Sequence, residues 1–185
     1  MDIDRILKMY NSGFSAQEIG DRLGRTVWQV YRIMKRHSFP RRKSSETRNI
    51  KFRKSPLSFS IRENLSLEDK QLWTSGLMLY WAEGSKAGKH VVDFANSNTS
   101  MILIFLKMLR NIYQITEDRL RIYIYCYSNQ DTGKIINYWS TLTQISKDKF
   151  TKPYIRTDYD IEKSDRMPHG LIHNRYADIM LLEKI

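Results

Sequence analysis

The sequence has a single cysteine, Cys126, among its 185 residues. A disulfide within the chain and a zinc site made of several cysteines are therefore excluded, and this usage is typical of a reducing cytoplasm. Long hydrophobic runs are also missing. The longest, MILIFL and GLMLYWA, fall well short of the roughly 18 apolar residues that a membrane-spanning helix needs. The first residues, MDIDRILKMY, lack the apolar core of a signal peptide, so we expect a cytoplasmic protein.

Acidic residues are also scarce. The chain has 20 Asp and Glu against 31 Lys and Arg, which gives a formal net charge of +11. Residues 1–54 hold fourteen Lys and Arg against five Asp and Glu, a net +9, whereas the rest of the chain carries only +2. The length is enough for one full domain and a small accessory one. A cationic module attached to a nearly balanced one indicates a polyanionic partner, nucleic acid first of all, and a place at the nucleoid if the host is bacterial or archaeal.

Residues 1–40 predict a small domain of three helices. Two of them begin with a capping box, Ser15-x-x-Glu18 and Thr26-x-x-Gln29, in which each partner satisfies a free amide of the other. Gly24 lies between the two helices and is a favourable left-handed stop. Two capped helices joined by a glycine turn predict a helix-turn-helix.

The second capped helix has an apolar face and a polar one. Val27, Val30, Ile33 and Met34 share the face that we expect to be buried. The segment resembles the helix-turn-helix modules of DNA resolvases and invertases, and this implies reading of duplex DNA. Gln29 and Arg32 suit base edges, and Lys35 suits phosphates. The alternative is a structural bundle with a solvated basic face. The expected DNA contacts here are Arg25, Trp28, Gln29, Arg32, Lys35 and Arg36.

Residues 41–64 are interpreted as a basic linker. The stretch RRKSSETRNIKFRKSP is rich in basic and small polar residues and lacks hydrophobic periodicity. Its first residues, Arg41, Arg42 and Lys43, are expected to lie along the DNA backbone or to enter a minor groove. The alternative is a tether that only keeps the chain in solution.

Residues 65–185 predict an α+β domain. A helix begins at a third box, Ser66-x-x-Asp69, and ends at Glu83-Gly84, with Leu67, Trp73 and Trp81 among its expected packing residues. The further predicted elements are strands at 90–97, 119–128, 150–157 and 171–176 and helices at 101–113 and 132–144.

The segment RLRIYIYCYS alternates between two faces. Leu120, Ile122, Ile124 and Cys126 are predicted to enter a core, whereas Arg121 and the tyrosines face outward. His173 and Arg175 alternate in the last strand, which allows them to share the face of Arg121. The outward residues that we expect to contact DNA are Arg121, Tyr123, Tyr125, Lys152, Arg156 and Arg175. The alternative is an ordinary solvent-exposed face.

The stretch GLMLYWAEG resembles the LAGLIDADG motif, with Glu83 at the last acidic position and Gly84 at the final glycine. YWAEGSK followed by FANSN is similar to free-standing LAGLIDADG-like domains. The resemblance implies a curved antiparallel sheet that reads DNA, and two motif helices packed together across a two-fold axis. It also implies that Glu83 is a catalytic acid that binds Mg²⁺ at the scissile phosphates. The implied interface residues are Gly76, Leu77, Leu79, Tyr80 and Ala82.

The sequence also departs from the LAGLIDADG pattern. Met78 replaces a small glycine, the acid is Glu rather than the commoner Asp, and the first strand is reduced to SKAGK. Because there is one clear motif copy, a two-fold site requires a homodimer. Lys86 and Lys89 follow the acid and suit phosphate contacts, or they are plain turn lysines.

Two functions remain open from the sequence. One is a homodimeric, Mg²⁺-dependent DNA endonuclease of homing-endonuclease type; the other is a non-catalytic transcriptional regulator on the same scaffold. The retained Glu83-Gly84 end favours the enzyme. The helix-turn-helix, which cleavage does not require, favours the regulator.

Overall fold

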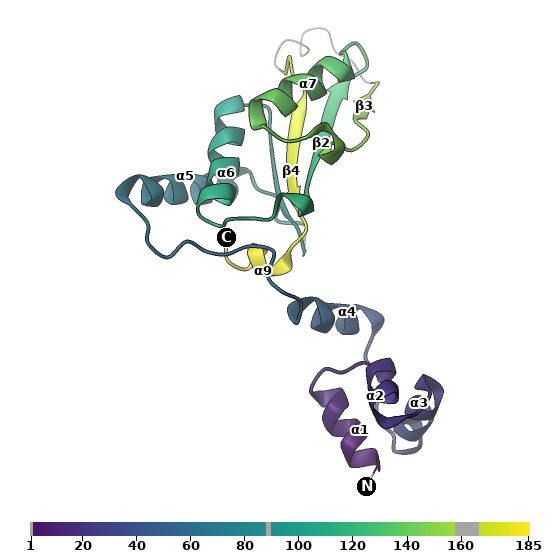
Figure 1. Ribbon diagram of the computed structural model, residues 1–185. Coiled ribbons are helices and arrows are strands. Elements are labelled where there is room, and N and C mark those ends of the chain that lie inside the picture. The colour runs from purple at the N-terminus through teal and green to yellow at the C-terminus, as the bar shows by residue number, and fades with distance from the viewer. Residues whose placement is uncertain (1, 88–89, 158–166) are drawn as a thin grey trace. The chain divides into compact units, whose positions relative to one another are not determined.

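The computed structural model describes residues 2–87, 90–157 and 167–185. The chain forms two compact units, residues 1–56 and 57–185 (Figure 1). The segment predicted as a linker after residue 40 is thus divided between them. Within the described ranges, no helix has the length and apolar character required to span a membrane.

The first unit contains the three predicted helices, α1 (Asp2–Asn11), α2 (Ala16–Leu23) and α3 (Val27–Arg36). Their apolar faces form a small core, as the helical spacing predicted. Val27 and Ile33 pack against this core at its margin. The fully or almost fully buried members are Ile6, Tyr10, Ala16, Ile19, Val30 and Met34.

Both predicted capping boxes of this unit are confirmed. The Ser15 Oγ accepts a hydrogen bond from the Glu18 amide at 3.2 Å, and the Glu18 carboxylate accepts one from the Ser15 amide at 2.7 Å. At the start of α3, the Thr26 hydroxyl oxygen accepts from the Gln29 backbone amide at 3.2 Å, and the Gln29 side-chain oxygen accepts from the Thr26 amide at 2.8 Å. Gly24 ends α2 with a φ of 63°, a left-handed conformation that glycine adopts without a steric cost. The turn between α2 and α3 is therefore fixed by local chemistry.

A fourth helix, α4 (Ser44–Arg53), lies within the segment interpreted as a basic linker, so part of that segment is helical. Hydrophobic periodicity did not reveal it because no residue of α4 is buried. Its end is held to the α1–α2 turn instead, where the Lys54 ammonium donates to the Ser12 carbonyl at 2.9 Å. At Gly13, a β-carbon would lie within 2.8 Å of Ile50, so α4 approaches this turn closely.

The second unit is built on a four-stranded sheet in the order β1–β4–β2–β3. The strands span Val92–Asn96 (β1), Leu120–Tyr127 (β2), Tyr154–Arg156 (β3) and Leu171–Tyr176 (β4). Strand β4 is antiparallel to β1 and to β2, but β2 and β3 are parallel. The expected antiparallel sheet was therefore wrong at one edge. The reason is the helix between β2 and β3, a crossover that returns the chain in the same direction.

Helices and one face of this sheet enclose a single core (Figure 1). Leu120, Ile122, Ile124 and Cys126 of β2 are at most 2% exposed, which confirms the predicted inward face. Trp139 of α7 is fully buried against the same cluster. The helices in the described part of this unit are α5 (Leu67–Glu83), α6 (Thr99–Asn111), α7 (Thr132–Thr143) and α9 (Ile179–Leu182), with short 3-10 helices at Glu117–Arg119 and Lys147–Lys149.

Helix α5 packs against α6 at a glycine. A β-carbon at Gly76 would lie within 2.8 Å of the Met108 Cβ, so the small residue allows the two helices to approach. Tyr80 of α5 stacks on Phe105 of α6 with ring centroids 5.7 Å apart. At the end of α5, a β-carbon on Gly84 would collide with the Tyr80 ring and carbonyl, so only glycine fits there. Both motif glycines thus serve the fold of this unit.

Candidate nucleic-acid interface

Helix α3 presents its predicted polar residues to solvent. Arg32, Lys35 and Arg36 are exposed, and Trp28 keeps 75% of its surface accessible. The first turn that carries Trp28 is anchored by the Thr26 cap. An exposed indole and three cations on one anchored helix form a surface suited to the acceptor groups and methyl groups of a duplex groove. Arg25, at the preceding turn, is half-buried.

Gln29 has a divided role that the sequence only partly revealed. Its side-chain carbonyl oxygen accepts a hydrogen bond from the Thr26 amide at 2.8 Å and thus completes the capping box. This bond uses one of the two lone pairs of the oxygen, so the second lone pair and the NH₂ group remain for contacts with a base. The capping bond fixes the direction in which the side chain can make them.

Arg41, Arg42 and Lys43 begin the segment interpreted as a basic linker. Two of these three cations contact aromatic rings of their own unit. The Arg41 guanidinium lies 3.9 Å from the Tyr31 ring centroid, and that of Arg42 lies 3.8 Å from the Tyr10 centroid. Arg42 also donates to the carbonyl oxygens of Tyr10 and Phe14. Its guanidinium has an internal structural role that the linker interpretation did not foresee, whereas Lys43 is exposed.

The outer face of the sheet in the second unit brings together side chains from distant parts of the sequence. Arg175 of β4 lies opposite both Asp93 of β1 and Arg121 of β2. Two residues along, His173 of β4 lies opposite Tyr123 of β2. These positions confirm that His173 and Arg175 share the face of Arg121.

Several charged groups on this face are engaged with the protein itself. The Asp93 carboxylate lies 3.0 Å from His173 Nδ1 and 3.2 Å from Arg175 Nε. Arg121 donates to the carbonyl oxygens of Asp118 and Leu120 at 2.6 and 2.7 Å. These contacts limit how freely Arg121 and Arg175 can reach a phosphate. Asp93 was missed in the sequence because its partners lie about eighty residues further along the chain.

Three rings form a row across neighbouring strands of the outer face. The centroids of His173 (β4) and Tyr125 (β2) are 4.7 Å apart, and those of Tyr125 and Tyr154 (β3) are 5.1 Å apart. Tyr154 is 60% exposed. Lys152 and Arg156 on the same side of the chain are exposed as well. The alternation of Lys152, Tyr154 and Arg156 in the sequence was the available signal for Tyr154.

The residues expected at a dimer interface lie mostly inside the unit. Gly76 and Tyr80 are buried in its core, and Leu77 and Leu79 pack against that core. Their apolar character is explained by α6 of the same chain. Ala82 alone of the five is exposed.

The large apolar residues of α5 that are exposed are not the ones expected at the dimer interface. Leu67, Met78 and Trp81 keep 71%, 57% and 72% of their surface. Leu67 and Trp81 were predicted to pack, and this was wrong. Trp73 is 36% exposed and donates its indole N–H to the Tyr113 hydroxyl. Met78 and Trp81, three residues apart, lie on neighbouring positions of the free side of α5.

Glu83 lies at the end of α5 with an exposed side chain. The neighbouring Lys86 folds back over the helix end, where its ammonium donates to the Tyr80 carbonyl at 2.7 Å. Lys89 lies outside the described residues. Among the residues that the structure does describe, no three His, Cys, Asp or Glu side chains gather as a metal site. The exposed Glu83 carboxylate is an oxygen donor of the kind that Mg²⁺ prefers, and other donors must come from elsewhere.

Comparison of the chain with protein-family models, with curated proteins and with solved structures found no match. What the chain does must therefore be inferred from the residues that it brings together. Two surfaces qualify: the exposed side of α3 and the outer face of the sheet.

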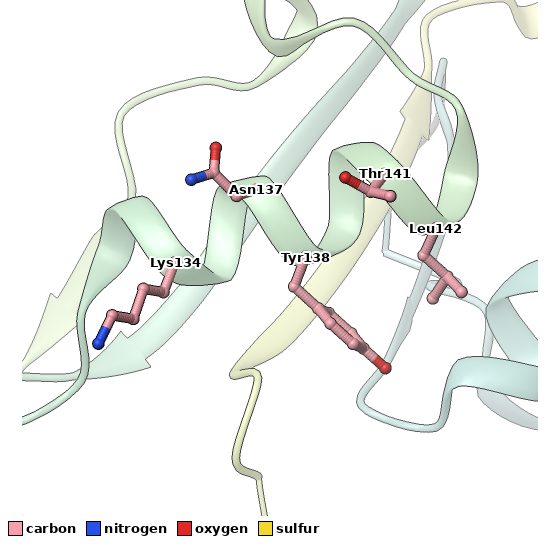
Figure 2. Close-up of a pocket in the computed structure, with 5 residues that line it drawn as sticks. All are labelled: Lys134, Asn137, Tyr138, Thr141 and Leu142. Carbon is pink, nitrogen blue, oxygen red and sulfur yellow. The ribbon is translucent and has the colours of Figure 1, made fainter.

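A hollow on α7 and the thiol of Cys126 are weaker candidates for a functional site than these two surfaces. The hollow has a volume of about 460 Å³ and is lined by one helix, with Asn137 and Thr141 on one side and Tyr138 and Leu142 on the other (Figure 2). No carboxylate is among its lining residues. Burial raises the pKa of the Cys126 thiol, which disfavours the reactive thiolate. Neither feature supports a catalytic role.

Proposed function

We propose that the protein binds double-stranded DNA sequence-specifically and that α3 is the reading helix. The observation that carries this proposal is the exposed set Trp28, Arg32, Lys35 and Arg36 on a helix whose start is anchored by the Thr26–Gln29 box. The net charge of +9 on residues 1–54 supports it, because neutralised phosphates provide most of the affinity of such a module.

The residue types suggest different roles on the duplex. Arg32 is suited to a bidentate contact with the O6 and N7 of a guanine. Lys35 and Arg36, in the last turn, suit phosphates, which set the position of the helix without reading sequence. The free NH₂ of Gln29 adds one donor, and the Trp28 ring suits contact with a thymine methyl group.

Truncation of α3 tests the proposal. Arg32→Ala is expected to cost about 1–3 kcal/mol on the preferred site at one base pair and to relax the preference there. Lys35→Ala is the matched control on the same helix, and it should weaken all duplexes alike. The measurement is selection from a randomised duplex library followed by titration of selected and random sites. Equal losses on both sites for Arg32→Ala would reduce α3 to a phosphate clamp.

Metal-dependent DNA cleavage by a homodimer is a second candidate function. It is favoured by the exposed Glu83 at the end of α5, together with the exposed Met78 and Trp81 on that helix. A second copy that covers Met78 and Trp81 would contribute the second carboxylate. Glu83 and phosphate oxygens would then hold Mg²⁺, which supplies water activation and charge stabilisation at the phosphate. If the protein binds DNA but does not cleave it, the proposed function is that of a DNA-binding regulator.

Glu83→Gln decides between cleavage and regulation. It preserves size and polarity but removes the charge that binds Mg²⁺, so nicking should fall by orders of magnitude while duplex affinity holds or improves. Calcium should support binding with little cutting. The measurement is a supercoiled-plasmid nicking assay next to a binding titration. If the wild type binds its site tightly but does not nick DNA with any metal, cleavage is excluded and the regulator is the proposed function that remains. Trp81→Glu, monitored by sedimentation, tests the dimer without altering the core.

A further inference from the structure

The ring row on the outer face of the sheet has a geometry that α3 does not offer. His173, Tyr125 and Tyr154 come from three adjacent strands, and their neighbouring centroids are 4.7 and 5.1 Å apart. The planes of neighbouring rings are tilted by 38° and 45°, so the rings are not stacked face to face on one another. We infer that this row binds unpaired bases of single-stranded nucleic acid by stacking.

The exposure of the row supports a ligand in addition to a structural role. Cross-strand aromatic pairs stabilise a sheet on their own, and this accounts for Tyr125, which is half-buried between its neighbours. Pairing also places Tyr154 opposite Tyr125, but Tyr154 is still 60% exposed on the short strand β3. The exposed ring of Tyr154 provides the flat apolar area that an unstacked base covers, and the tilted rings of Tyr125 and His173 continue the row.

The charges beside the row suit a polynucleotide strand. Lys152 and Arg156 flank Tyr154 in the sequence and are exposed. Within the described residues, the carboxylate of Asp93 contacts the row and is paired with His173 Nδ1 and with Arg175. Because Asp93 binds Nδ1, Nε2 is the ring nitrogen of His173 that could bond to a base or phosphate. The row therefore combines rings with cations, as surfaces for single strands do.

Unpaired bases fit this surface better than a duplex does. A duplex presents base edges and phosphates, and its base faces are already stacked on one another. Rings can cover a base face only where the strand is unpaired. The inference concerns the sheet strands of the second unit and Lys152, so it holds whether or not α3 reads a duplex.

The test compares two oligonucleotides that differ only in their bases. Full-length protein is titrated with a labelled oligothymidylate of about twelve nucleotides and with an abasic strand of equal length and charge. The wild type should bind the thymidylate at least ~10-fold more tightly, because the phosphates are common to both strands. Tyr154→Ala should reduce thymidylate affinity by ~5-fold or more with little effect on the abasic strand.

Two variants control for the fold of β3. Tyr154→Phe keeps the ring and should keep the affinity. Ile155→Ala alters the adjacent residue, which is 49% exposed and occupies the opposite face of the strand, and it should leave binding unchanged. Equal affinity of the wild type for both strands would overturn the inference, and so would equal losses for Tyr154→Ala and Ile155→Ala.

Two further arms identify the strand and separate this inference from the proposed function. Displacement by oligouridylate of equal length extends the stacking chemistry to RNA, and failure to displace restricts it to DNA. Arg32→Ala should lower duplex affinity and spare the difference between thymidylate and abasic strands. If Arg32→Ala leaves duplex binding intact, the α3 proposal fails while the ring row is judged by its own assay.

Discussion

The two units use their positive charge differently. In the first unit, the cations of α3 are exposed to solvent, and this ten-residue helix has no acid in its first turn. In the second unit, the outer face of the sheet holds Arg121 and Arg175, both engaged with oxygen atoms of the protein itself. A count of basic residues therefore overestimates the number of cations with which the sheet can contact phosphates. For α3, the count is closer to the number available.

Arg42 is an instructive exception within the first unit. It belongs to the most basic stretch of the chain, yet its guanidinium contacts the Tyr10 ring and two carbonyl oxygens. The difference between the units thus follows the surroundings of each cation. A guanidinium near unsatisfied carbonyls or rings binds them, whereas a helix face whose amides are already bonded leaves its side chains free.

The largest expected effect concerns salt. If the first unit supplies six or more phosphate contacts, duplex affinity should fall by roughly 10³ or more between 50 and 200 mM salt. Replacing Lys35 and Arg36 together by Gln should reduce the slope of log affinity against log salt by about 1.8, or about 0.9 for each phosphate contact. Replacing Arg121, Arg156 and Arg175 should reduce it less, since all three contact oxygen atoms or a ring of the protein itself. Equal reductions, measured by titration at several salt concentrations, would contradict the comparison.

A smaller effect is expected from the helix contact that builds the second unit. Gly76→Val places side-chain atoms where Met108 lies and should destabilise the unit by about 1–3 kcal/mol. Met78→Val, two residues on at a 57% exposed position, should change stability by about 0.5 kcal/mol or less. Denaturant unfolding of both variants measures the difference. A tolerated Gly76→Val would show that α5 and α6 need no such approach.

The smallest effect is a pH dependence of the first unit. The hydrogen bond from the Ser15 amide, followed by that from its hydroxyl, lowers the pKa of Glu18 below its ordinary value. Because the folded-state pKa is lowered, this contribution is present above the unfolded-state pKa and is lost as pH falls through the folded-state pKa. Because the Glu18 side chain is exposed and screened by solvent, this contribution should be about 0.5 kcal/mol or less. Thermal unfolding between pH 6 and roughly pH 3 measures it, and Glu18→Gln should remove this component. An unchanged pH profile in Glu18→Gln would contradict the assignment.

Local patterns predicted much of both units. Three capping boxes, the Gly24 stop and the alternation of β2 all appear in the structure as expected. These features depend on bonds between residues three or four apart, or on a strict period of two, so nearby sequence specifies them. The fold class, α+β, was predicted for the same reason.

Other features required the assembled chain. Helix α4 has no buried face, and the parallel pairing of β3 with β2 depends on how the α7 crossover returns. The side of α5 that meets α6 could not be predicted either, because the apolar residues of the motif surround the helix: Gly76 and Tyr80 face inward whereas Met78 and Trp81 remain exposed.

The candidate surfaces divide in the same way. The sequence by itself determined the α3 surface, because one helical period and one capping box place Trp28, Arg32 and Lys35. Only the tertiary structure decided the ring row and its charges. His173, Tyr125 and Tyr154 become neighbours through strand order and register, and the sequence pattern of a single strand carries no record of which strand will lie beside it.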